Sequence, residues 1–141
     1  MQKNKSFVPK LGEVYYMRFT GTGSEQQGWR PGVVFQNNVG NAHSPNIIAL
    51  PMTTSLKKCG QPTHIVIPAD SSGLDRDSMV LCENPERMSK DRIGDYITTL
   101  SEEEMRRIAF ASLLATSAIA FLDDESIIAA REQATELVFA R

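Results

Sequence analysis

The chain has 141 residues and a mass of 15.6 kDa, with 23% charged and 41% hydrophobic residues. These values fit one globular domain and exclude a disordered, collagen-like or low-complexity protein. The formal net charge is −2, which excludes binding of nucleic acid through overall positive charge. The charge is divided unevenly, because residues 1–60 carry +5 and residues 61–141 carry −7. A local basic face is therefore compatible with an acidic whole.

Neither the cysteines nor the apolar segments indicate export, a membrane or a metal. Cys59 and Cys82 belong to no CxxC motif or histidine cluster, so they predict neither a disulfide framework nor a zinc site. The N-terminal segment lacks the apolar run of a signal peptide. The longest segment without charge, residues 108–122, is shorter than the ~20 residues that span a membrane. We therefore expect a cytoplasmic protein with no membrane contact, metal or cofactor.

The first two thirds of the chain predict short strands. Runs rich in β-branched and aromatic residues, separated by Gly-, Pro-, Asn- and Asp-rich turns, occur at 13–19, 32–36, 47–54, 63–68 and 78–82. Strands this short leave exposed edges unless their sheet closes, which favours a small antiparallel barrel. Pro51 inside the third run predicts an edge position or a bulge there.

The last third changes to a helical period, so the predicted fold class is mainly β with C-terminal α. Ser101 followed by three glutamates is a capping box and begins the first helix. One apolar stripe then runs to Leu122, while other large apolar residues lie off it and predict a subunit contact: Phe110, Leu113 and Leu114. Asp123 is the expected cap of an additional terminal helix.

The residues that could carry chemistry lie between Gly21 and Thr54. Familiar catalytic signatures such as GxSxG, the P-loop and HExxH are missing, and a lone strand residue such as His64 is more often structural than catalytic. Arg30 follows a glycine-rich loop and precedes a proline, which holds its backbone extended. Its guanidinium suits a phosphate, and it could equally pair with Glu25. Lys57 and Lys58 add positive charge after the third strand.

Several motifs occur together and in one order. They are GEVY at 12–15, GSEQ at 23–26, RP at 30–31, VFQNN at 34–38, MT at 52–53, PTH at 62–64 and KDR at 90–92. Over about residues 12–118 this combination closely resembles the MazF/PemK family of toxin endoribonucleases, and most of all its Gram-positive branch. The resemblance gives the expected domains: an N-terminal extension (1–11), the toxin domain (12–122) and an extra C-terminal helix (123–141) that packs on the domain or on a partner.

The resemblance implies an SH3-like (CcdB/MazF-type) barrel that forms a homodimer and acts as the toxin of a type II toxin–antitoxin system. Such toxins cleave single-stranded RNA at specific sequences without a metal. The ribose 2′-OH attacks the adjacent phosphate and leaves a 2′,3′-cyclic phosphate and a 5′-OH. The implied partners are RNA and a MazE-like antitoxin whose acidic C-terminal tail lies in the RNA groove. The alternative is a non-catalytic or gyrase-directed binding protein on the same fold.

Matched by motif, the family's catalytic residues correspond to Arg30 and Thr53. Thr54 would replace Thr53 only if the strand slipped by one residue, which turns its side chain to the other face. The residues expected to bind RNA are Ser24, Glu25, Gln26, Lys57, Lys58, Gln61, Glu83 and Asn84. Relatives usually have Glu-Gln-Ile-Arg where this chain has ENPE at 83–86, so we do not transfer their cleavage motif.

Overall fold

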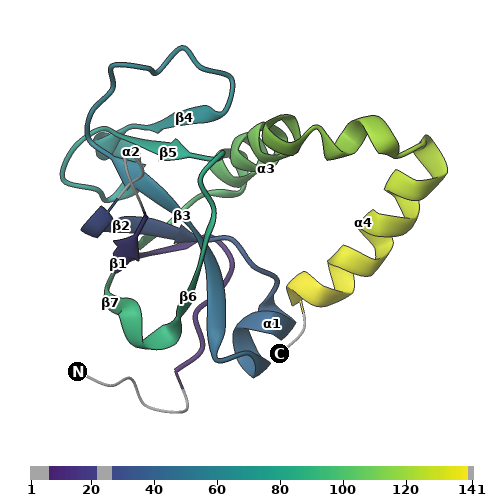
Figure 1. The fold of residues 1–141 in the computed structure, drawn as a ribbon, viewed down its shortest axis with the longest axis horizontal. Coiled ribbons are helices and arrows are strands. Elements are labelled where there is room, and N and C mark those ends of the chain that lie inside the picture. Colours follow the sequence, from purple (N-terminus) through teal and green to yellow (C-terminus); the bar gives the residue numbers. More distant parts are fainter. Residues whose placement is uncertain (1–6, 22–26, 140–141) are drawn as a thin grey trace.

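The structure is a computed structural model that describes residues 7–21 and 27–139 (Figure 1). Its strands are β1 (Glu13–Thr20), β2 (Gln27–Val34), β3 (Asn46–Thr53), β4 (His64–Ile67), β5 (Ser78–Leu81), β6 (Glu86–Ser89) and β7 (Ile93–Thr99). Its helices are α1 (Asn38–His43), α2 (Ala69–Ser72), α3 (Glu102–Thr116) and α4 (Asp124–Phe139), with two short 3₁₀ turns, η1 (Lys90–Arg92) and η2 (Ala118–Phe121).

The strands form one antiparallel sheet in the order β4-β5-β3-β2-β1-β7, and β6 pairs with β3 outside this path. The prediction of a mainly antiparallel β fold with C-terminal helices is therefore confirmed. Among the described residues, the strand pairing does not close the sheet into a complete barrel. Figure 1 shows α3 against the β4–β5 end of the sheet and α1 at the end near β6.

The strand β3 lies in the middle of this sheet, which corrects the predicted edge position of Pro51. On one side β3 pairs with β2, where Pro51 faces Gly32. On its other side it pairs with β6 through residues 46–49 and with β5 through residues 52–53. Pro51 thus lies where β3 exchanges one neighbour for another. A residue without an N–H is tolerated there because no continuous ladder runs along that side.

Two apolar clusters hold the sheet together. One joins the sheet to α3 through Ile108 and Ala111, which are 0% and 1% exposed. The other surrounds Met17 and Met88 between β1, β3, β6 and β7. The predicted capping box begins α3: Ser101 Oγ accepts from the Glu104 N–H at 3.1 Å, and Glu104 Oε1 accepts from the Ser101 N–H at 2.8 Å.

The C-terminal segment leaves the sheet as an arm, which we define as residues 117–139. The first helix ends at Thr116 rather than at the predicted Leu122, because Ser117 has a left-handed backbone with φ 55°. Asp123 caps α4 as predicted, since its Oδ1 accepts from the Ser126 N–H at 2.8 Å. Hydrogen bonds from the backbone and the side chain of Ser126 lower the Asp123 pKa.

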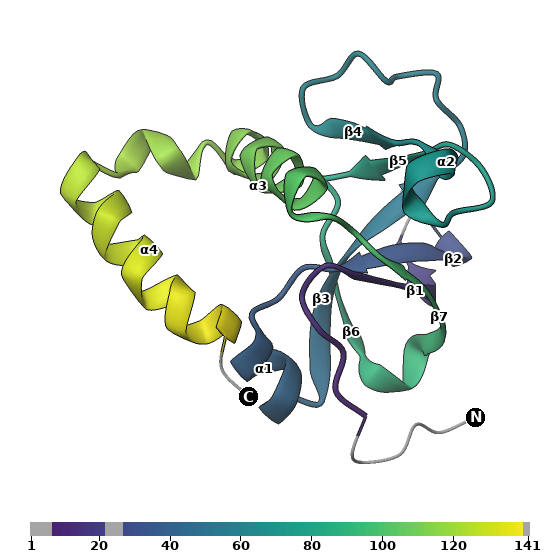
Figure 2. The same ribbon diagram turned by 180° about the vertical axis from the view of Figure 1, so that it is seen from behind.

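Most of the arm is exposed, and Phe121 is 90% accessible. The far end of the arm returns to α1, where Asn38 Nδ2 donates to the Val138 carbonyl at 2.5 Å (Figure 2). Among the described residues, no helix combines the length and the apolar character that crossing a membrane requires.

Candidate active site

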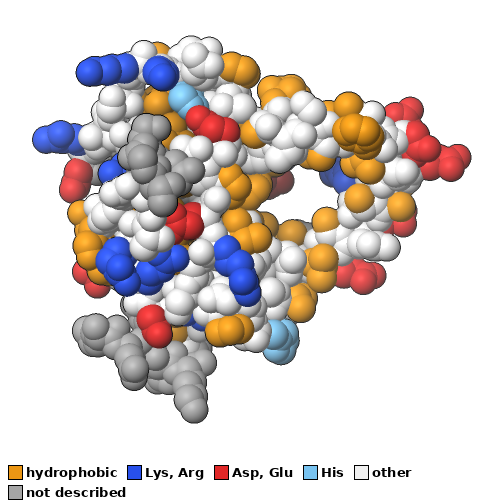
Figure 3. Space-filling view, in the orientation of Figure 1, with side chains coloured by type: hydrophobic (Ala, Val, Ile, Leu, Met, Phe, Trp, Pro, Cys, Tyr) orange, Lys and Arg blue, Asp and Glu red, His pale blue; other side chains and the backbone are white. Residues whose placement is uncertain are grey.

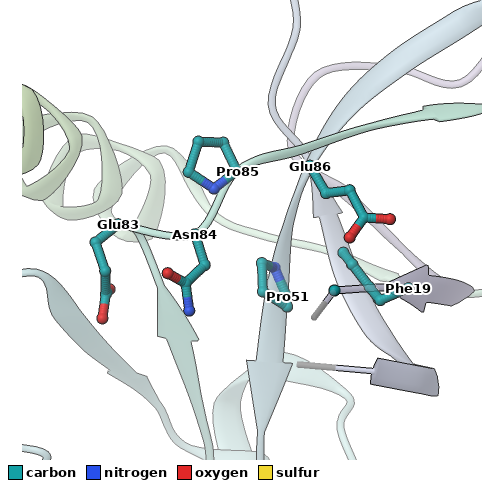
Figure 4. Close-up of a pocket in the computed structure, with 7 residues that line it drawn as sticks. Phe19, Pro51, Glu83, Asn84, Pro85 and Glu86 are labelled. Atoms are coloured by element: carbon teal, nitrogen blue, oxygen red, sulfur yellow. The ribbon is translucent and has the colours of Figure 1, made fainter. Parts of the chain in front are cut away.

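Two adjoining hollows lie on one side of the sheet, and we call them together the polar groove. The first has a volume of about 200 Å³ and is lined by Phe19, Gly21, Pro51, Glu83, Asn84, Pro85 and Glu86. The second has a volume of about 400 Å³ and is lined by Thr53, Ser55, Lys57, Lys58, His64, Met79, Leu81, Glu83 and Asn84. Both contain Glu83 and Asn84, which follow β5 and point the same way in Figure 4, whereas the Pro85 ring turns to the other side.

Strand register places Arg30 and Thr53 on the same face of the sheet. The β2–β3 pairing ends where Gly32 faces Pro51. Arg30 and Thr53 each lie two residues beyond this pair, so the alternation of side chains along a strand puts them on the same face. Arg30 is half-buried, and its guanidinium donates to the Gln27 carbonyl from Nη2 at 3.0 Å and from Nε at 3.3 Å.

Thr53 and Thr54 point to opposite faces, as alternation along a strand requires. Thr53 lines the polar groove, and its Oγ1 accepts from the Ser55 N–H at 3.1 Å. Thr54 lines a separate hollow of about 470 Å³ together with Tyr16 and Pro31. The arrangement that the sequence predicts for Thr53 therefore needs no slip of the strand.

The histidine of the PTH motif ties two borders of the groove together. His64 begins β4, and its Nδ1 lies 2.8 Å from the Lys58 carbonyl oxygen. Its Nε2 lies 2.6 Å from Glu83 Oε2, and its side chain is 8% exposed. The loop that carries Lys57 and Lys58 is thereby joined to the turn that carries Glu83. Sequence reasoning treated His64 as a structural strand residue and missed this contact.

The second carboxylate of the groove is also paired. Glu86 Oε2 lies 3.1 Å from Arg92 Nη1 and accepts from the Thr20 N–H at 3.1 Å. Arg92 Nη1 also donates to Thr20 Oγ1 at 3.0 Å. These contacts fix the end of β1, from which the loop at 21–26 departs. No sequence signal pointed to this cluster, because it joins residues that are far apart in the chain.

The structure brings five of the ten predicted site residues together. Thr53, Lys57, Lys58, Glu83 and Asn84 all line the polar groove. Gln61 lies in the exposed turn before β4, where its carbonyl accepts from the His64 N–H at 3.1 Å. The remaining predicted residues fall outside the described residues: Ser24, Glu25 and Gln26.

Neither a reactive thiol at Cys82 nor a metal cluster is found among the described residues. Burial raises the Cys82 pKa to about 12, and the charge of Glu83 adds to the effect, so Cys82 is a neutral thiol near pH 7 and no nucleophile. Within residues 7–21 and 27–139, no group of three or more His, Cys, Asp or Glu side chains could hold a metal ion.

The arm is the most acidic part of the surface. In Figure 3 lysine and arginine side chains lie over the sheet and the loop before β4, with acidic side chains among them, and further acidic side chains gather on the arm. The arm contains Asp123, Asp124, Glu125, Glu132 and Glu136 against the single cation Arg131. The arm therefore holds only part of the negative charge of residues 61–141, and the rest lies on the same body as the basic residues.

Fold and site together define a class of protein. It is a small antiparallel β domain with an arginine and a threonine on one face of the sheet, and with a groove rich in polar side chains on that face. The family model described as "PemK-like, MazF-like toxin of type II toxin-antitoxin system" matches residues 10–113. The chain belongs to this family.

Curated relatives and solved structures agree with this family. Endoribonuclease EndoA of Bacillus subtilis is 37% identical over 115 residues, which are 81% of this chain and 99% of that protein. Endoribonuclease MazF of Staphylococcus saprophyticus is 37% identical over 100 residues, covering 70% and 83%. A mycobacterial endoribonuclease, solved in complex with its cognate antitoxin, is 27% identical, with a TM-score of 0.65 over 79% of this chain and 97% of its own.

Proposed function

We propose that this protein is the toxin of a type II toxin–antitoxin system and cleaves single-stranded RNA at specific sequences without a metal. The enzyme class, an endoribonuclease, is that of its relatives in Bacillus and Staphylococcus. What supports the finer proposal is that Arg30 and Thr53 fall on the same face of the sheet by the alternation along β2 and β3, and that Thr53 lines the polar groove.

The chemistry requires a group that stabilises charge on the phosphate. When the ribose 2′-OH attacks, negative charge increases on the non-bridging oxygens as the phosphorus becomes five-coordinate. A guanidinium and a hydroxyl aimed at those oxygens stabilise this state more than the ground state. Because a guanidinium cannot be deprotonated in proteins, Arg30 acts chiefly as an electrostatic stabiliser or as an acid. The Thr53 hydroxyl donates a hydrogen bond to a phosphate oxygen. The O2′–P bond forms as the P–O5′ bond breaks, and the products are a 2′,3′-cyclic phosphate and a 5′-OH.

The polar groove fits a single strand better than a duplex. Its carboxylate and amide side chains, Glu83 and Asn84, can hydrogen-bond the edges of bases that have been unstacked. Lys57 and Lys58 supply positive charge for the phosphates at the same end. Ser24, Glu25 and Gln26, which lie outside the described residues, are also proposed to bind RNA.

Sequence specificity is expected to differ from that of the relatives. Asn84 is shorter than the glutamine that relatives usually carry, and Pro85 has no backbone donor. Glu86 stands where relatives have an arginine, so a cation that could contact a phosphate is missing at this position, and Glu86 itself is paired with Arg92 at 3.1 Å. The bases read beside these residues should therefore not be those that the relatives read.

The proposed protein partners are a second copy and an antitoxin. The mycobacterial relative was solved with its cognate antitoxin. An acidic, disordered tail would compete with RNA for Lys57, Lys58 and Arg30. A homodimer would cover apolar side chains that α3 leaves exposed: Phe110 at 66%, Leu113 at 42% and Leu114 at 41%.

The test is cleavage of a long single-stranded RNA in EDTA, with the new ends mapped and their 5′-OH groups verified. We expect Arg30→Ala to abolish cutting and Thr53→Val to reduce it about 100-fold or more. Thr54→Val is the matched control, because Thr54 has the same chemistry on the other face, and it should cut normally. Arg30→Lys keeps the positive charge but removes the two parallel donors of the guanidinium. Near-full cleavage by this variant would mean that the charge alone suffices for catalysis.

Other outcomes would favour a different function. If Arg30→Ala cuts like the unmodified protein, the nuclease proposal fails. Intact RNA together with inhibition of DNA gyrase by the unmodified protein would instead support the non-catalytic, gyrase-directed alternative.

A further inference from the structure

The hydrogen-bond partners of His64 indicate how many protons its imidazole ring shares with its neighbours. The Lys58 carbonyl oxygen can only accept, so His64 Nδ1, at 2.8 Å from it, carries a hydrogen. The Nε2 to Glu83 Oε2 distance of 2.6 Å is a strong hydrogen bond and therefore needs a second proton between the two atoms. An imidazolium facing a carboxylate satisfies both contacts. In this form the pair carries no net charge toward the groove.

The two carboxylates of the polar groove are thus both neutralised, but by different kinds of cation. Glu86 faces Arg92, whose guanidinium stays protonated at every physiological pH. Glu83 faces His64, and histidine is the side chain whose ordinary pKa brings its charge change between pH 5 and 8. Loss of the shared proton would leave an uncompensated carboxylate in a groove that receives a polyanion.

We propose that His64 is a positioning residue that offsets the charge of Glu83 and thereby makes the affinity of the groove for RNA fall as pH rises through neutrality. The inference rests on the proposed function, because it requires RNA to occupy the groove. It concerns how tightly the substrate is held and assigns His64 no part in the chemical step.

The other charges around His64 do not share this behaviour. Lys57 and Lys58 face it from the loop before β4, and lysine stays charged between pH 5 and 8. The helix α3 packs against β4 mainly through the apolar Ile108 cluster, and its buried acid, Glu104, is held by Ser101 in the capping box. Of the residue types in this cluster, histidine is therefore the one whose ordinary charge change falls between pH 5 and 8.

The experiment measures binding separately from chemistry. An RNA oligonucleotide spanning a mapped cleavage site, with a 2′-deoxy sugar at the nucleophilic position, cannot be cut by 2′-OH attack. Its dissociation constant is measured by fluorescence anisotropy from about pH 5.5 to about pH 8, at constant ionic strength. One unit charge about 8 Å from a phosphate, at an effective dielectric constant of about 40, weakens binding about fivefold. We expect a rise of that size across the range.

Substitutions distinguish a charge from a structural tether. His64→Asn can keep a donor near the Lys58 carbonyl, and His64→Gln can keep one near Glu83, but both are neutral. Both should give flat pH profiles at the affinity that the unmodified protein shows at high pH. Glu83→Gln should also flatten the profile, whatever its effect on absolute affinity. His43→Gln is the matched control, since His43 is the other of the two histidines in the chain and is exposed on α1; it should keep the slope.

The outcomes separate this inference from the proposed function. RNA that binds and is cut while the profile of the unmodified protein stays flat overturns the role of His64 alone. A normal slope in His64→Asn also overturns it, because a neutral tether would then suffice. RNA that neither binds nor is cut at any pH overturns both proposals.

Discussion

The docking of α3 on the sheet can be tested with two substitutions in the same helix. Ile108 is 0% exposed in the cluster that joins α3 to the sheet, whereas Phe110 is 66% exposed. Ile108→Ala removes three buried carbons, worth about 0.8 kcal/mol each, and leaves a cavity, so the unfolding free energy should fall by about 3 kcal/mol. Phe110→Ala should change it by less than about 1 kcal/mol, because little area is lost and alanine favours the helix.

The assay is urea unfolding followed by circular dichroism at two protein concentrations. Equal losses in the two variants would refute the orientation of α3 described above. A loss in Phe110→Ala that grows as the protein is concentrated would show instead that a second copy covers Phe110, as the sequence predicts for the surplus apolar face.

Three further outcomes are expected. Ser101→Ala should lower the unfolding free energy by about 1 kcal/mol, measured by urea unfolding, because it removes the acceptor of the capping box. A thiol-reactive disulfide probe at about pH 8 should label exposed Cys59 in the native protein and Cys82 only after unfolding. Burial covers Cys82 and raises its pKa to about 12, so its thiol stays protonated. Prompt labelling of both cysteines would contradict this. A chain ended after Ser117 should still fold and lose less than about 2 kcal/mol, because a hydrogen bond such as that from Asn38 to Val138 contributes about 1 kcal/mol; failure to fold would contradict it.

The strands that the sequence predicted are those with a buried face. The runs at 13–19, 47–54 and 78–82 alternate or concentrate apolar residues, and they match β1, β3 and β5 within two residues. The strand β6, Glu86–Ser89, was missed because only Met88 in it is buried. The strand β7 was missed because most of its side chains are half-buried or exposed.

Proline placement explains the remaining difference in the strands. The predicted strand at 32–36 begins earlier in the structure, at Gln27. Its added residues, 27–31, pair with β1 and not with β3. That segment is a sheet edge, where Pro31 is tolerated. From sequence alone, Gly28 and Pro31 indicate a turn.

The site was predictable where a motif marked it and not where tertiary contacts create it. Thr53 and Lys57 lie within one short stretch of chain, so their proximity could be inferred. The contact of His64 with Glu83 depends on the β4–β5 register, in which His64 faces Leu81. A single sequence carries no direct information on that register, so the histidine could not be assigned beforehand.

The acidic arm described above also makes the molecule an electric dipole. Its positive end contains Lys57 and Lys58, and its negative end is the arm with Asp123, Asp124 and Glu125. In the field of a polyanion such a body experiences a torque before contact, which turns the groove toward the polymer and the arm away from it. Because the acidic arm repels a polyanion, replacing its acids with neutral amides should raise the association rate with RNA at low ionic strength and leave the dissociation rate nearly unchanged.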